Sequence, residues 1–445
     1  MPAGSEFWYI PLTMADRPAR VSAAVDRGSE RSVRRLQELV RVARAGEAAT
    51  QALVAAALDD AGCRVETFRY APRDLALPHQ FVRDGEEAGE RTAVVGCLGD
   101  AHAVRLLLFA HPDVEPVAGT ERWRHPPFAG VIEDGRVRGW GVADDLAGVA
   151  IMVGALDALR DAGLTPRGGL IAASSPSKRD ARGIVAVLGR GHRADAAVYL
   201  HPAESGHGLA EIKAATPGLL RFRVTVRGRP ADTREPEQTP FAHRAVDPIE
   251  KVAVLAIALR ACADRRAARV RHPAIEAAIG RATNLQLAYV HAGAPDRLGR
   301  ASDTCVLAGS ITFPPGESME SVQAEVAETL GAAAAGDPWL RGDPPTLDWL
   351  FGAAGAEVGR DHPLYRDLRG TIGAVTGREP VLNALHASSD IGHPILHAGI
   401  PTVGFGPRAG DLSQAGGHDE WVDVAEYLQA IAVTARLVAD WCDAG

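Results

Sequence analysis

Two periods of hydrophobic and polar positions run along the chain, one of helical spacing and one of strand-like alternation. From Ser29 to Ala61 apolar residues recur at helical spacing, broken by one glycine, and residues 63–70 then read as a strand. Strands are predicted next at 92–98, 104–110, 169–174 and 195–200, in alternation with helices at 145–163 and 183–189. Such alternation predicts a parallel, doubly wound sheet, which binds ligands beyond the carboxyl ends of its strands.

The pattern changes near Pro217, where a stretch typical of a half-exposed antiparallel strand begins. A helix, two strands and a second helix follow, predicted at residues 247–263, 284–293, 304–313 and 318–330. This order predicts a small α+β insert of ferredoxin-like type. A helix from Pro363, a strand at 402–407 and a final helix resume the alternation of strands and helices that precedes Pro217, so the insert interrupts the main domain.

We therefore predict an α/β fold, with a doubly wound, mostly parallel sheet in the main domain and an inserted ferredoxin-like α+β domain. The main domain is expected at residues 29–216 and 337–445, and the insert at residues 217–336. Residues 1–28 are expected to form an N-terminal extension.

Composition and charge narrow the classes of partner. The chain has 445 residues, enough for two hydrophobic cores. Its net charge of −8 and its scattered arginines argue against nucleic-acid binding. It contains neither a run of about eighteen apolar residues nor a signal-peptide pattern, and its five cysteines have no disulfide or CxxC spacing. We expect a cytoplasmic protein that binds small molecules or proteins, with no nucleic-acid or membrane partner.

Four stretches carry a family resemblance by their order and spacing, at residues 106–150, 193–205, 306–318 and 398–427. They include "AHPD", "GWGVADD", "YLHPAES" and "GGHDEWV". The chain thereby resembles the acetylornithine deacetylase and succinyl-diaminopimelate desuccinylase family of metallopeptidases and amidohydrolases, roughly from Ser29 to Cys442. The resemblance implies that the main domain is catalytic and that the insert is a lid, which usually makes a homodimer.

The resemblance also implies a metal site. Members of the family hold two zinc ions bridged by one aspartate, each ion completed by a histidine and a carboxylate, while a separate glutamate activates the water. Here His111 matches one imidazole ligand, Asp113 the carboxylate that orients the catalytic groups, and Asp144 the bridging aspartate. His201 stands where the family has glutamate, and imidazole is a sound zinc ligand. One half-site for a single Zn²⁺, made by His111, Asp144 and His201, is therefore possible.

The other half-site is lost. The pair of glutamates that supplies the water-activating base and a zinc ligand falls on Ser177 and Lys178. The last histidine ligand falls on Gly416, although His418 could replace it if the loop shifted by two residues. The lid histidine that reaches into the partner subunit falls on Asp232, a candidate substrate contact.

Several further residues are candidates. His243 could substitute for the lid histidine, because such a residue has only to reach the site. A segment with His386, Ser389 and Asp390 stands where the family has a substrate-side Thr/Ser-Asp motif, and we expect it to line the pocket. The family's lid arginine, which often grips a substrate carboxylate, is Thr312 here.

Ser177 and Lys178 change the chemistry that the site can perform. Hydrolysis needs a carboxylate to take a proton from metal-bound water, and a serine hydroxyl does not titrate near neutral pH. The Lys178 ammonium would repel a second metal ion, although it could replace the charge of that ion. A serine nucleophile with a lysine base is a weaker idea, since neighbours on an extended strand point to opposite sides. The two residues also fit a solvated loop in a decayed site.

Three hypotheses follow for an amino-acid-derived or N-acyl amino acid substrate. The first is an enzyme with a single-metal or metal-free site that performs acyl transfer, condensation or cyclisation. The second is a mono-zinc amidase or peptidase in which Glu115, Asp145 or Glu204 supplies the base. The third is a non-catalytic binding or scaffold protein on the same fold.

Overall fold

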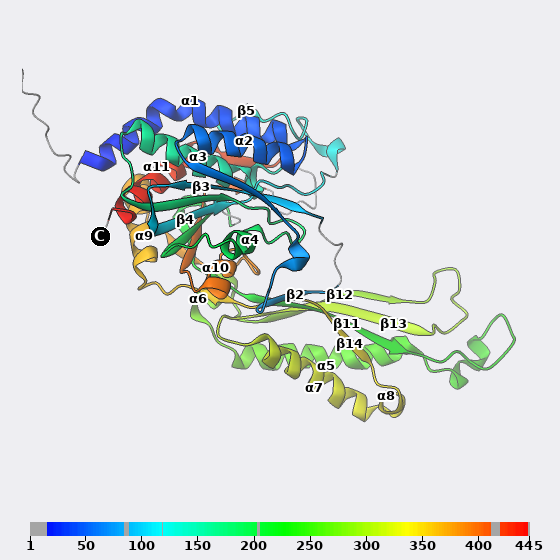
Figure 1. Cartoon of the computed structure of the whole chain (residues 1–445). Helices are drawn as coiled ribbons and strands as arrows, with labels where there is room; N and C mark the ends of the chain where they lie inside the picture. Colours follow the sequence, from blue (N-terminus) through cyan, green and yellow to red (C-terminus); the bar gives the residue numbers. More distant parts are fainter. Residues whose placement is uncertain (1–15, 84–88, 118, 203–204, 411–418, 444–445) are drawn as a thin grey trace, which may run out of the picture.

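The computed structural model describes residues 16–83, 89–117, 119–202, 205–410 and 419–443, and shows a larger domain with a smaller one beside it (Figure 1). The larger domain contains an eight-stranded sheet in the order β1-β3-β7-β4-β8-β17-β9-β16. Its strands are β1 (Arg64–Tyr70), β3 (Arg91–Leu98), β4 (Asp100–Ala110), β7 (Gly168–Ser174), β8 (Ala196–Leu200), β9 (Glu211–Lys213), β16 (Val381–Asn383) and β17 (Thr402–Phe405).

The centre of this sheet is parallel. Strand β4 pairs in parallel with both β7 and β8, and β17 pairs in parallel with β8. The central strands are short apolar runs buried on both faces, which is typical of a parallel sheet covered on both sides. The predicted α/β fold with a doubly wound, mostly parallel sheet is confirmed.

Helices cover both faces of the sheet. One face packs against five helices: α1 (Arg17–Ala43), α2 (Glu47–Asp60), α3 (Ala147–Asp161), α9 (Pro363–Thr376) and α11 (Val424–Trp441). The other face packs against α4 (Gly183–Gly189) and α10 (Gly392–Ala398), which lie toward the smaller domain (Figure 1). Helix α3 is buried from Ala147 to Leu159 because its alanines, glycines and branched apolar residues pack against the sheet and against neighbouring helices.

The smaller domain is the predicted ferredoxin-like insert. Its five-stranded antiparallel sheet has the order β12-β13-β11-β14-β2, and the helices α5 and α7 contact each other and pack on this sheet. The elements are β11 (Gly218–Arg227), α5 (Pro248–Arg269), β12 (Asn284–Ala292), β13 (Thr304–Phe313), α7 (Met319–Gly336) and β14 (Thr346–Ala353).

Two boundaries differ from the sequence expectation. Strand β14 pairs with β11, so the sheet of the insert continues beyond residue 336, and β2 (Gln80–Val82) joins it from the first part of the chain. Helix α1 begins at Arg17, inside the segment expected to be an extension. Its first half buries the small residues Ala24 and Gly28 beside Val21 and Val25.

None of the helices in the described residues combines the length and apolar character that a membrane crossing requires.

Candidate active site

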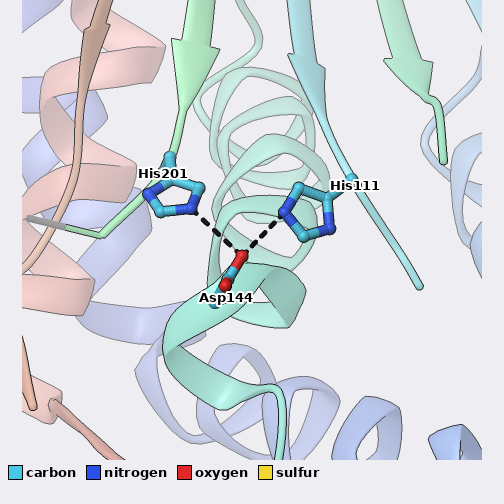
Figure 2. A group of neighbouring side chains, drawn as sticks. All are labelled: His111, Asp144 and His201. Carbon is cyan, nitrogen blue, oxygen red and sulfur yellow. Dashed lines mark hydrogen bonds and ion pairs between the residues drawn. The ribbon is translucent and has the colours of Figure 1, made fainter. Parts of the chain in front are cut away.

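Three polar side chains meet where two neighbouring parallel strands end. His111 directly follows β4, and His201 directly follows β8. Because β4 and β8 are paired in parallel, their carboxyl ends lie at the same edge of the sheet. Asp144 comes from the distorted turn Val142–Leu146 that leads into α3, and its side chain points between the two imidazoles (Figure 2).

The distances within this group suit a metal ion. The Asp144 Oδ1 atom lies 2.9 Å from Nε2 of His111 and 3.3 Å from Nε2 of His201. One ligand atom from each of the three residues lies within 4.8 Å of the others. Two imidazoles and one carboxylate are a donor set that zinc prefers. The residues present therefore fit one metal ion.

The second oxygen of Asp144 has a different partner. The Lys178 Nζ atom lies 2.5 Å from Asp144 Oδ2, and the two side chains are 18% and 13% exposed. The ammonium thus occupies the side of the aspartate that would face a second ion. A dinuclear arrangement does not fit these residues, because a cation would have to approach a fixed ammonium at the same carboxylate.

Asp113 fixes the turn that carries this lysine. Its carboxylate accepts hydrogen bonds from the backbone N–H groups of Ser177 and Lys178, at 2.9 and 2.8 Å. Its Oδ1 atom also lies 3.4 Å from Nδ1 of His111. Asp113 therefore positions both His111 and the 177–178 turn. The Ser177 side chain is half-buried.

The charges in the group reinforce one another. Burial raises the pKa of Asp144, but His111, His201 and Lys178 outweigh it and hold that pKa well below its ordinary value. Burial lowers the pKa of His111, yet Asp113 and Asp144 raise it to about 10. Burial also lowers the pKa of Lys178, and Asp144 more than offsets this, so the net shift is upward. Asp144 is thus an anion held between cationic or hydrogen-bonding neighbours.

Two buried carboxyl groups support the backbone around Asp144. Asp145 is fully buried and accepts hydrogen bonds from the backbone N–H groups of His111 and Gly148. Burial raises the pKa of Asp145 well above its usual range. Glu420 accepts from Gly141 N at 3.0 Å and from Ala143 N at 2.6 Å, and burial raises the pKa of Glu420 to about 8. Both groups bind backbone N–H groups, so they act as structural supports.

The sequence interpretation missed Lys213. This residue is 2% exposed on β9, and its Nζ atom lies 2.9 Å from Nδ1 of His201 and 3.2 Å from the Pro202 carbonyl oxygen. It therefore holds the His201 ring from the side opposite Asp144. A lysine in the mostly apolar run of residues 208–220 was the available signal, since buried lysines almost always have a partner.

The segment with His386 lies beside the His201 ring. The two ring centroids are 6.1 Å apart, and the His386 carbonyl oxygen accepts a hydrogen bond from Thr216 Oγ1. The backbone N–H of Ser389 donates to the same hydroxyl oxygen, and Asp390 lies 3.6 Å from Nε2 of His393. The role of His386, Ser389 and Asp390 as pocket lining stays a prediction.

The remaining candidates are not joined to this group. Asp232 and His243 are exposed on the smaller domain, and in the described part of the chain neither has a hydrogen bond or ion pair to the group. Glu115, weighed as a base, pairs with Arg179 at 3.2 Å. The other candidates, Glu204, Gly416 and His418, lie outside the described residues.

A cavity of about 320 Å³ adjoins the site on the side of the 177–179 turn. Asp113 and Lys178 line one wall, and Glu47, Arg91 and Arg179 contribute further charges. Arg91 forms an ion pair with Glu47 at 2.6 Å and lies 3.9 Å from Asp113. A space of this size suits a small molecule.

The chain matches one protein-family model and several named relatives over most of its length. The family model described as peptidase family M20/M25/M40 matches residues 107–440, well over half of the chain. An N-formyl-4-amino-5-aminomethyl-2-methylpyrimidine deformylase of Halalkalibacterium halodurans is 27% identical over 352 residues, covering 76% of this chain and 79% of that protein. A succinyl-diaminopimelate desuccinylase of Methylobacterium radiotolerans is 30% identical over 341 residues, covering 75% and 80%.

A solved structure extends the likeness to the whole fold. The M20 family metallo-carboxypeptidase from Sulfolobus solfataricus superposes with a TM-score of 0.68 at 14% identity, covering 92% of this chain and 99% of that one. At this identity the likeness shows the fold, in which a main domain and a lid domain are combined.

Proposed function

Because this chain belongs to peptidase family M20/M25/M40, a family of metal-dependent amidohydrolases and peptidases that act on small substrates, we propose that it is an enzyme for a small amino-acid-derived or N-acyl compound. We propose further that it performs acyl transfer, condensation or cyclisation. One observation carries this proposal: the Lys178 ammonium lies against Asp144 where a dinuclear enzyme would hold its second ion.

The hydrogen bonds and ion pairs of the acidic residues near the site favour a reaction in which no carboxylate activates a water molecule. A general base must have a free carboxylate oxygen within reach of the proton that it removes. Asp113 receives two backbone N–H groups, Asp145 receives two more, and Glu115 pairs with Arg179. Asp113 and Asp145 are thus committed to backbone N–H groups, and Glu115 is engaged by Arg179 through one oxygen, whereas Lys178 can stabilise negative charge that develops on an acyl oxygen.

His111, Asp144 and His201 would hold a single Zn²⁺. When bound, the ion would act as a Lewis acid that polarises an acyl carbonyl. The chain's own groups then have separate tasks. Lys178 supplies a fixed positive charge, Asp113 positions His111 and the 177–178 turn, and the Pro202 carbonyl oxygen, 2.8 Å from Nδ1 of His201, orients the His201 ring.

A second candidate function is hydrolysis by one zinc ion. It is favoured by the names of the two relatives, a deformylase and a desuccinylase, which both remove an acyl group from an amine. The group of two histidines and one aspartate supports it equally well.

One experiment separates the two functions. Purified protein is analysed for metal by elemental analysis and is then incubated with N-formyl and N-succinyl amines, with and without a second amine as acceptor. Transfer predicts an acylated acceptor by mass spectrometry and little free acid. Free acid that is released without an acceptor, and that a chelator abolishes, would instead establish the mono-zinc hydrolase. A protein that converts no acyl amine under either condition would contradict both.

We also propose that the chain forms a homodimer through its lid domain. Strand β12 is an edge of the lid sheet, and Val290 on it is 63% exposed. Ile257 on the adjacent helix α5 is 72% exposed, so apolar side chains lie along one side of the lid. Exposed edges and apolar patches of this kind mark association surfaces. Light scattering should give a dimer for the wild type and a monomer for Ile257→Glu.

A further inference from the structure

The backbone of Lys178 is held from both sides by charged side chains. Its N–H donates to Asp113 Oδ2 at 2.8 Å, and its carbonyl oxygen accepts a hydrogen bond from Nη2 of Arg91 at 3.2 Å. Arg91 is the first residue of β3, and its side chain is 16% exposed. Because Asp113 holds one end of this residue and Arg91 holds the other, the point from which the lysine side chain extends is fixed between them.

Arg91 is itself fixed by the first residue of α2. Its Nη1 atom forms an ion pair with Glu47 Oε2 at 2.6 Å, and the other oxygen of Glu47 accepts the Thr92 backbone N–H at 3.0 Å. The same Nη1 atom lies 3.9 Å from Asp113 Oδ2. Charge-assisted contacts of a planar guanidinium set its orientation as well as its position. The pair of Glu47 and Arg91 is therefore a support that reaches Lys178 from α2 and β3.

The turn that follows Lys178 needs such a support. Arg179, Asp180 and Arg182 have φ angles of +54°, +56° and +50°, in the left-handed region that residues with a Cβ seldom adopt. A strained backbone of this kind persists only where the surrounding structure holds it in place. Arg91 binds the carbonyl oxygen directly before the strained residues. Without Arg91 the turn could relax and carry Lys178 with it.

The position of Lys178 matters because its charge is compact. Only three of the 48 lysine and arginine residues in this chain are lysines, and two of them, Lys178 and Lys213, lie in the candidate active site. A lysine ammonium is a point charge, whereas a guanidinium spreads its charge over a plane. Lys178 places this charge 2.5 Å from one oxygen of Asp144, so a small displacement of the turn would withdraw it from the aspartate.

We propose that Arg91, held by Glu47, is a positioning residue that keeps the Lys178 ammonium on Asp144. This inference rests on the proposed function, because it names the residues that place the charge which the proposed reaction uses. Arg91 acts through the backbone of Lys178, and Lys178 acts at the acyl oxygen.

Amine labelling tests the position of Lys178 without requiring turnover. The full-length protein is treated with sulfosuccinimidyl acetate, and acetylation of each lysine is followed by peptide mass spectrometry. Lys251 is the internal reference, since it pairs with Asp337 at 2.9 Å and these side chains are 20% and 12% exposed, close to the 18% and 13% of Lys178 and Asp144. In the wild type both lysines should react slowly.

Arg91→Gln should release Lys178 from this protection. The acetylation rate of Lys178 should rise by about tenfold, because a charge-assisted hydrogen bond at its carbonyl oxygen is lost, and the rate of Lys251 should not change. Arg91→Lys should keep part of the protection, since it retains the positive charge beside Glu47. Glu47→Gln should raise the rate of Lys178 less than Arg91→Gln does, because Arg91 then keeps its contact with the turn.

Arg17→Gln is the matched control. Arg17 has the same exposure as Arg91, 16%, and it pairs with Asp443 at 2.7 Å and donates to the Ala439 carbonyl oxygen at 3.2 Å. It lies at the start of α1 and has no printed contact with the 177–182 turn, so Lys178 in Arg17→Gln should react as in the wild type.

The outcomes separate the positioning role from the reaction. A folded Arg91→Gln protein that labels Lys178 at the wild-type rate overturns the proposal, as does one in which Lys178 and Lys251 gain reactivity equally. If Arg91→Gln is unfolded, Glu47→Gln decides, and a wild-type ratio of Lys178 to Lys251 labelling then overturns the proposal. Fast labelling of Lys178 in Arg91→Gln with unchanged acyl transfer would leave the positioning role standing and remove Lys178 from the proposed reaction. Acyl transfer by the wild type, with slow labelling of Lys178 in Arg91→Gln, would do the reverse.

Discussion

Lys178→Met tests whether the lysine has replaced a metal ion as the charge that neutralises Asp144. The substitution keeps the length of the side chain and removes its ammonium, 2.5 Å from Asp144 Oδ2. Removing one partner of a buried ion pair costs about 3–5 kcal/mol. His111 and His201 remain beside the aspartate, and both partners keep some solvent exposure. We therefore expect the free energy of unfolding to fall by about 2–3 kcal/mol.

The assay is urea unfolding at pH 7.5 with a chelator present, so that metal cannot compensate for the lost charge. The control is Arg34→Met, which removes a surface ion pair with Glu30 whose side chains are 68% and 86% exposed. That variant should change the free energy of unfolding by less than about 0.5 kcal/mol. If Lys178→Met is no less stable than Arg34→Met, the ammonium does not hold Asp144 and the reasoning is refuted.

Lys178→Glu extends the same test. It places a second carboxylate beside Asp144, so without metal it should be less stable than Lys178→Met. Added zinc should then raise its unfolding free energy more than it raises that of the wild type, because ion binding to the folded state is linked to stability.

Three further predictions concern the groups around this centre. Burial raises the pKa of Glu420 from its ordinary 4.5 to about 8, so the protonated form is preferred in the folded state. The contribution of Glu420 to the free energy of unfolding is complete below about pH 4.5 and is lost as the pH rises through 8. Glu420→Gln should therefore reduce the loss of unfolding free energy between pH 5 and 8, by up to about 1.4 kcal/mol per pH unit, and equal slopes in urea titrations would contradict this. Gly148→Ala should lower the free energy of unfolding by roughly 3 kcal/mol or more, because its Cβ would lie 1.9 Å from the Leu200 carbonyl oxygen. Gly370→Ala in α9 has open space around the added Cβ and should raise the free energy of unfolding by about 0.5–1 kcal/mol. Thermal melts measure both changes. His111→Ala should lose the roughly one zinc per chain expected for the wild type by elemental analysis, and a metal content unchanged from the wild type would exclude His111 as a ligand.

Local hydrophobic patterns in the sequence predicted β1, β3, β4, β7, β8 and β17, but not the short strands β9 and β16 of the same sheet. The family resemblance of the motifs at the carboxyl ends of β4 and β8 indicated His111 and His201. Because parallel strands end at a common edge, two residues distant in sequence could be expected to meet there. The altered pair Ser177 and Lys178 could be recognised only through the family resemblance, because the family has two glutamates at these positions.

Features that depend on tertiary packing could not be predicted in this way. Lys213 and Arg91 are charged residues in otherwise ordinary segments, and only the packing of β9 on its neighbours and of α2 on β3 gives them their surroundings. Strand β14 follows the expected end of the insert, and its place beside β11 comes from non-local pairing. The start of α1 was not predicted because, among its buried positions before Ser29, only Val21 and Val25 are large apolar residues, and the others are Ala24 and Gly28.

Strand β2 has a consequence for how this molecule must be made. It supplies the last strand of the lid sheet, yet it lies between β1 and β3 of the main domain, far ahead of its partner β14 in the chain. During synthesis the ribosome releases β2 long before β14 exists, so the lid sheet can be completed only after most of the chain has emerged. A protein fragment of residues 217–353 alone would leave the edge of β14 unpaired. A fragment with the complete lid sheet would also have to contain residues 80–82.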